Sequence, residues 1–115
     1  SMRPSAGPVI ASALPDAVTN RIFSISLQGD LASGEQVVKP VLMAKGRQVG
    51  AVGMAVDANF DSATGAVTLQ PNKAVTIAFL LSDDSVSSLR IVVQDPASDA
   101  ELYRSPNDIP VRLGV

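Results

Sequence analysis

The oxygen-bearing side chains of Asp57, Asn59 and Asp61 stand at every second position of one polar stretch. Calcium takes roughly six to eight oxygen ligands, and helix-flanked calcium loops place the first three at alternate positions of this kind. The same loops require Gly at their sixth position and Glu at their twelfth, where this chain has Ser62 and Thr68. We therefore expect a hairpin turn here, with a calcium site at Asp57, Asn59 and Asp61 as the alternative.

The other carboxylates predict turns and loops rather than a catalytic pair. Asp83 and Asp84 are adjacent, and neighbours in a strand point to opposite faces, so the sequence SDDS favours a turn with local hydrogen bonds. We interpret Asp95, Asp99 and Glu101 as part of a solvated loop. The chain has no histidine and no cysteine, which excludes a Ser-His-Asp triad, a thiolate nucleophile and sites built on imidazole or thiolate ligands. We expect no enzyme, no catalytic residue and no cofactor.

The basic residues Lys39, Lys45 and Arg47 surround one predicted hairpin, whose turn is Lys45-Gly46-Arg47. Lysine and proline commonly protect edge strands against unwanted pairing, which is the simpler role for these residues. Their concentration at one hairpin also makes them our candidate docking face. Nine Lys and Arg against eleven Asp and Glu give a net charge of -2, too little positive charge to attract nucleic acid.

Apolar residues alternate along most of the chain, and this predicts strands. Phe23, Ile25 and Leu27 share one face of a half-buried strand. The same alternation recurs in three later segments, residues 67–69, 75–81 and 89–93. Pro40 cannot donate to a ladder and favours an edge position or a bulge. No segment has the apolar stripe of a helix, and no apolar run reaches the roughly 20 residues of a membrane span.

The segment before the polar stretch predicts a strand with unusual packing. Val52, Met54 and Val56 fall on one face, and the two glycines of the segment, Gly50 and Gly53, indicate a bend or a close approach of the backbone. We expect this strand to end near Val56, the chain to reverse through residues 61–65, and the next strand to begin at Ala66.

The length of 115 residues fits one domain. Residues 1–8, which contain two of the eight prolines, are expected to be a flexible linker or a remnant left by protease cleavage. A first edge strand is expected at residues 8–13, and residues 9–115 are expected to form a single β-sandwich. About seven or eight short strands with frequent turns predict an all-β, immunoglobulin-like sandwich of two sheets.

The alternating segment Val67–Leu81, followed by a polar turn and the strand Leu89–Asp95, resembles the central strands of bacterial immunoglobulin-like modules. Asn72 stands where these modules more often have glycine, and the Trp and paired Cys of antibody domains are absent. Modules of this kind serve as spacers, subunit-docking domains, chaperones of fibre assembly and sugar binders, so the resemblance implies an architecture rather than one role.

We therefore expect a non-catalytic protein-interaction or assembly module from a bacterial envelope, surface or secreted protein, located outside the cytoplasm. It would bind a protein partner through an edge strand or a sheet face. Neither nucleic acid nor membrane insertion is expected. One alternative is a carbohydrate- or calcium-binding accessory domain, for which Tyr103 is the obvious aromatic contact to a sugar. Another is a capsid or fibre subunit.

Overall fold

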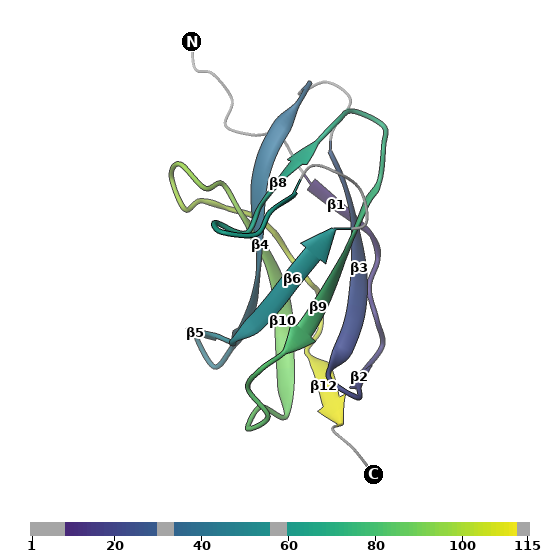
Figure 1. Ribbon diagram of the computed structural model, residues 1–115, viewed down its shortest axis with the longest axis vertical. Coiled ribbons are helices and arrows are strands. Elements are labelled where there is room, and N and C mark those ends of the chain that lie inside the picture. The colour runs from purple at the N-terminus through teal and green to yellow at the C-terminus, as the bar shows by residue number, and fades with distance from the viewer. Residues whose placement is uncertain (1–8, 30–33, 56–59, 113–115) are drawn as a thin grey trace.

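The computed structural model describes residues 9–29, 34–55 and 60–112, and every regular element within these ranges is a β-strand. The strands form two sheets (Figure 1), which confirms the predicted all-β, two-sheet sandwich. The smaller sheet contains, in spatial order, β1 (Val9–Ala13), β3 (Ile22–Gly29), β9 (Val75–Leu81) and β6 (Ala51–Ala55). The larger sheet contains β2 (Val18–Thr19), β12 (Ile109–Arg112), β10 (Ser88–Gln94), β4 (Gln36–Ala44), β8 (Ala66–Leu69) and β7 (Phe60–Asp61), with β11 (Glu101–Arg104) beside β10 and β5 (Arg47–Gln48) beside β4. Three of the twelve segments in the described ranges are only two residues long, which explains most of the excess over the predicted number of strands.

The hydrophobic core lies between the sheets and follows the predicted alternation. Phe23, Ile25 and Leu27 of β3 are buried, and the ring of Phe23 stacks on Phe79 of β9 with ring centroids 5.6 Å apart. The facing sheet contributes buried residues of β4, β8 and β10, namely Val38, Leu42, Val67, Leu69, Leu89, Ile91 and Val93. Full burial of such a side chain contributes about 1.5–3 kcal/mol, so aliphatic packing across the sandwich is the main source of its stability.

The N-terminal segment joins the two sheets to each other. β1 pairs antiparallel with β3 of the smaller sheet, whereas β2 pairs parallel with β12 of the larger one. Pro15, which has no N–H to donate to either ladder, lies between the two pairings. β1 also lies against β11. This crossing closes one side of the sandwich and accounts for the strand predicted at residues 8–13.

Pro40 lies on an inner strand of the larger sheet, but β4 is paired on only one side at this residue, so the predicted edge position holds locally and not for the strand as a whole. β4 lies between β10 and β8, and its register with β10 runs from Lys39 to Met43 without a shift. The amide of Ser105 donates to the carbonyl of Ile91, so the backbone N–H and C=O groups of Ile91 point away from β4. Those of its neighbours Arg90 and Val92 therefore point toward β4. Because bonded and non-bonded pairs alternate in an antiparallel ladder, Pro40 directs its nitrogen away from β10. On that side β8 pairs only with residues 36–38 and β5 only with residues 43–44, so the missing N–H costs no ladder bond.

β6 confirms the shared face of Val52 and Met54, and the structure places that face in solvent. Val56 lies outside the described residues. Gly53 points inward, where a Cβ atom would lie 3.1 Å from the Phe79 ring and 3.3 Å from the Phe60 ring. The predicted close approach of the backbone therefore occurs at Gly53, because the rings of Phe79 and Phe60 pack against this residue and leave no room for a side chain.

Candidate docking surface

The polar stretch that contains Asp61 forms the hairpin turn between β7 and β8. The Oδ1 atom of Asp61 accepts hydrogen bonds from the amides of Ala63 at 2.9 Å and Thr64 at 3.4 Å. Gly65, at φ 79°, donates its amide to the Asp61 carbonyl at 2.7 Å, and β8 begins at Ala66 as predicted. Asp57 and Asn59 lie outside the described residues. Within the described ranges, no three His, Cys, Asp or Glu residues gather as metal ligands would.

The remaining acidic residues also shape turns. The Oδ1 atom of Asp83 accepts the hydroxyl of Ser85 at 2.6 Å and its amide at 2.9 Å, which confirms the predicted SDDS turn. The hydroxyl, then the amide of Ser85, and to a smaller extent the charge of Arg47 hold the pKa of Asp83 below its usual value. Asp84 forms an exposed ion pair with Arg21 at 2.9 Å. Asp83 is thus bonded to Ser85 and Asp84 to Arg21, which gives both carboxylates a structural role.

The loop after β10 is arranged in the same way. The Oδ1 atom of Asp95 accepts the amide of Ala97 at 2.9 Å, and the carbonyl of Asp95 accepts the amide of Asp99 at 2.7 Å. Glu101 is held by two hydrogen bonds from Arg104, and these bonds lower the pKa of Glu101. The three acidic residues therefore do not converge on one point, in agreement with the predicted solvated loop.

The structure separates the three basic residues of the predicted docking face. Lys45 and Arg47 flank the turn between β4 and β5, as expected. Lys39 lies further back on β4, where its side chain passes Gly65 of the β7–β8 turn. Lys39 and Lys45 are six positions apart on one extended segment, which corresponds to roughly 20 Å at about 3.3 Å per residue. Only Lys45 and Arg47 can contact the same small group.

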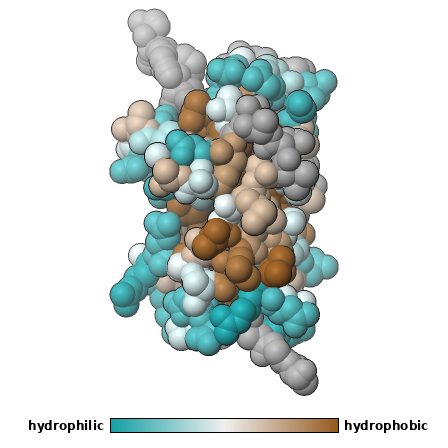
Figure 2. All heavy atoms as spheres, viewed as in Figure 1, coloured by the Kyte–Doolittle hydropathy of each residue, from teal (hydrophilic) through white to brown (hydrophobic). Residues whose placement is uncertain are grey.

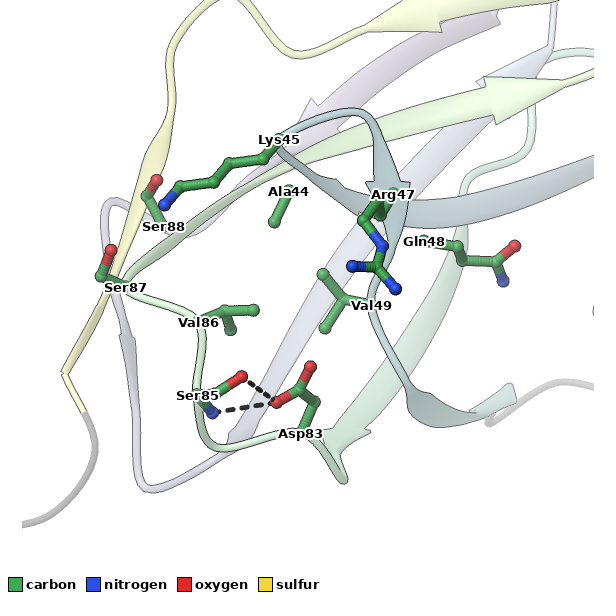
Figure 3. A pocket seen from close by; sticks show the side chains of 10 residues that line it. All are labelled: Ala44, Lys45, Arg47, Gln48, Val49, Asp83, Ser85, Val86, Ser87 and Ser88. Carbon is green, nitrogen blue, oxygen red and sulfur yellow. Dashed lines mark hydrogen bonds between the residues drawn. The ribbon is translucent and has the colours of Figure 1, made fainter.

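Lys45 and Arg47 line a cleft of about 430 Å³ at one end of the sandwich. Figure 3 shows both side chains extending from the hairpin, with Asp83 and Ser85 on the opposite wall of the cleft. Ser87 and other residues of the loop between β9 and β10 complete the lining. The cleft thus combines both signs of charge, and within it the hydroxyl of Ser85 donates to the Asp83 carboxylate at 2.6 Å as part of the SDDS turn.

An exposed apolar patch covers part of the outer face of the smaller sheet. It consists of Ile22, Val52, Met54 and Leu80, whose exposed fractions are 62%, 58%, 61% and 45%. Cross-strand pairing makes it continuous, because Leu80 lies opposite Ile22 on one side and Val52 on the other. Figure 2 shows apolar side chains gathered on this face, over the region where Figure 1 places β6, β9 and β3 side by side. We call these four residues the outer patch.

The sequence interpretation missed half of the outer patch. The pattern predicts a common face for Val52 and Met54, but the alternation of buried residues around Ile22 and Leu80 does not mark these two as part of a surface. The available signal was that Leu80 stands between the inward-facing residues Phe79 and Leu81 and must therefore point outward. A single outward apolar residue is normal on a protein surface, so Leu80 becomes informative only with the sheet order that places it between Ile22 and Val52.

β6 also forms an open edge of the smaller sheet. The amide of Ser82 donates to the carbonyl of Gly50 at 3.0 Å, which extends the register between β6 and β9 by one pair. Because bonded and non-bonded pairs alternate, Ala51, Gly53 and Ala55 direct their N–H and C=O groups away from β9. In the part of the chain that the structure describes, no strand pairs with this edge.

A groove of about 370 Å³ runs beside the open edge of β6. Its lining includes residues of β6, residues 39–42 of β4, which pair with β10 on one side, and the turn after β7. Phe60 and Phe79 form part of its apolar wall, and Lys39 contributes the one charged side chain among the lining residues that the structure describes. An apolar face, free backbone groups and a groove therefore meet along β6.

Tyr103 does not project from the surface as a sugar-binding ring would. It lies on β11 opposite Val93, is partly buried and packs against the core. Burial raises the pKa of its hydroxyl. Much of its apolar surface is thus occupied by protein contacts.

Among the described residues, the structure contains no helix long and apolar enough to cross a membrane. Comparisons with protein-family models, with curated proteins and with solved structures found no match for the chain.

Proposed function

We propose that this chain is a non-catalytic, immunoglobulin-like module that docks to a protein through its smaller sheet. The split of the N-terminal segment between β1 and the parallel strand β2 supports the immunoglobulin-like assignment, together with the resemblance in residues 67–95. That resemblance is also the support for a bacterial envelope, surface or secreted protein and for a location outside the cytoplasm.

The outer patch is the single observation that carries the docking role. Four large apolar side chains lie on neighbouring strands of one sheet, and each remains about half exposed or more. Single exposed apolar residues are normal on protein surfaces, whereas a contiguous group marks an interaction site. Val37 provides the contrast, since it is 46% exposed but lies on β4 of the other sheet.

The open edge of β6 adds a second element to the same surface. Free backbone groups at a sheet edge provide affinity for an extended segment, and neighbouring side chains provide its register. The outer patch borders this edge through Val52 and Met54. A partner that covers the outer patch can therefore also form hydrogen bonds with the free backbone groups of β6.

Binding with immobilised protein tests this proposal. The wild type, a Val52→Lys/Leu80→Lys variant and a Val37→Lys control are exposed to native extract and to the purified chain. We expect a defined protein to be retained by the wild type and by Val37→Lys and to be lost from the double variant. Equal retention by all three, or binding to a glycan array with no protein retained, would overturn the docking role.

A further inference from the structure

The backbone of β6 has bonding capacity that the described fold leaves unused. Ala51, Gly53 and Ala55 direct N–H and C=O groups outward, and no described strand lies beyond them. The opposite edge of the same sheet differs, because β1 lies against β11 of the facing sheet. The β6 edge is therefore the end at which this sheet can be extended.

β6 lacks the features that normally prevent such extension. Edge strands are usually protected by charged residues, proline or a bulge. The sequence of β6 is AVGMA, without charge or proline, and its register with β9 runs from Ala51 to Ala55 without a shift. Its inward side chains are only alanine and glycine, and the one charged side chain among the described residues of the groove beside it is Lys39, which belongs to β4 of the facing sheet.

Two copies of β6 are complementary to each other in an antiparallel arrangement. A two-fold axis at Gly53 places Gly53 opposite Gly53 of the second copy and Ala51 opposite Ala55 of the second copy. These are the residues whose backbone groups point outward, so all three pairs are hydrogen-bonded. A shift by one residue would instead present the backbone groups of Val52 and Met54, which already bond β9.

The same arrangement covers the exposed side chains of the strand. Val52 lies opposite Met54 of the second copy, in non-bonded pairs, where side chains approach most closely. The flexible Met side chain can adapt to the branched Val side chain, and symmetry forms this contact twice. The rows of Leu80 and Ile22 continue the apolar face on both sides of the junction.

We propose that the partner of this surface is a second copy of the chain, bound through antiparallel pairing of the two β6 strands about Gly53. The two four-stranded sheets then form one sheet of eight strands with a joined outer patch. This inference rests on the proposed docking function, because it names the partner of the same surface.

Disulfide trapping tests the register directly, since the chain has no cysteine of its own. In a Val52→Cys/Met54→Cys variant, the cysteine at position 52 of one copy lies opposite the cysteine at position 54 of the other copy. Their Cα atoms are about 4.5 Å apart, a separation that a disulfide accepts. In the single variant Val52→Cys the two cysteines are diagonal neighbours, roughly 7–8 Å apart, which is too far. We expect a covalent dimer from the double variant and its loss in Val52→Cys and in a Val37→Cys control.

Sedimentation of the untrapped protein gives an independent result. We expect the wild type to sediment at twice the monomer mass at high concentration and Val52→Lys to sediment as a monomer with an unchanged circular dichroism spectrum. A monomeric wild type with no trapped dimer from the double variant would overturn the pairing. If the outer patch then still retained a different protein from extract, the docking function would stand without it; if it retained none, both proposals would fall.

Discussion

At the scale of single residues, the acidic side chains of this chain organise turns. Asp61 and Asp83 each accept hydrogen bonds from groups two residues ahead, and Asp95 does the same in the loop after β10. Short polar side chains in turns commonly bond the local backbone in this way. The side-chain oxygen of Asp61 is thus bonded to the backbone of its own turn.

Replacing Asp61 by alanine tests this role. Asp61→Ala removes the acceptor of two amides and is expected to lower the free energy of unfolding by about 0.5–1.5 kcal/mol. Asp61→Asn keeps an oxygen acceptor at the same place and should be close to neutral. Urea unfolding measures both variants, and equal destabilisation would show that charge, not hydrogen bonding, is what matters at this turn.

Calcium addition tests the alternative use of the same residues. Because Asp61 already bonds the turn, we expect millimolar calcium to leave the melting temperature of chelator-treated protein unchanged. A rise in melting temperature that Asp61→Asn abolishes would instead establish a calcium site in this stretch.

The lowered pKa of Asp83 predicts a pH dependence with a definite sign. A carboxyl whose pKa is lower in the folded state stabilises the protein above its unfolded pKa, and this contribution is lost as the pH falls through the folded value. The stability difference between wild type and Asp83→Asn should therefore be present at neutral pH, begin to fall near about pH 4 and be lost as the pH drops through the lower folded pKa. Urea unfolding across this range measures it. Ser85→Ala, which removes the hydroxyl donor, should reduce the same difference; a difference that grows in acid would contradict the assignment.

At the scale of strands, alternation predicted which face is buried, but not which strands are neighbours. Phe23, Ile25 and Leu27 could be assigned to the core because burial of one face imposes a period of two. Pro40 could not be placed, because its position depends on where β8 ends and β5 begins beside β4. The glycine at position 53 predicted that another group packs closely against the backbone, but not that this group is the rings of Phe79 and Phe60.

A pair of glycine substitutions tests the packing of β6. In Gly53→Ala the new Cβ atom would meet aromatic carbons of Phe79 and Phe60 that the core holds in place, so we expect a loss of about 1 kcal/mol or more. In Gly50→Ala the nearest atom is the hydroxyl of Ser82 at 3.2 Å, which can rotate away. This control should be neutral or more stable by up to about 1 kcal/mol through the unfolded state. Thermal or urea unfolding compares them, and a reversed order would contradict the inward orientation of Gly53.

At the scale of the whole molecule, the sandwich assembles a surface that no segment carries alone. The residues of the outer patch lie on β3, β6 and β9, far apart in the chain, and only the sheet order makes them neighbours. The sequence therefore predicted the two-sheet architecture, whereas the docking role stays a prediction, for which the sequence offered the charged hairpin as the candidate face. Lys39 belongs to the groove beside β6, whereas Lys45 and Arg47 belong to the polar cleft at one end.

Site-specific photo-crosslinking tests the central claim most directly, that the outer face of the smaller sheet is a docking surface. A photoreactive phenylalanine analogue is introduced at Leu80 and, as a control of similar exposure, at Val37 on the other sheet. After irradiation in native extract, the docking role predicts a discrete crosslinked protein, a second copy of the chain included, at Leu80 and none at Val37. Equal crosslinking at both positions, or none at Leu80, would contradict it.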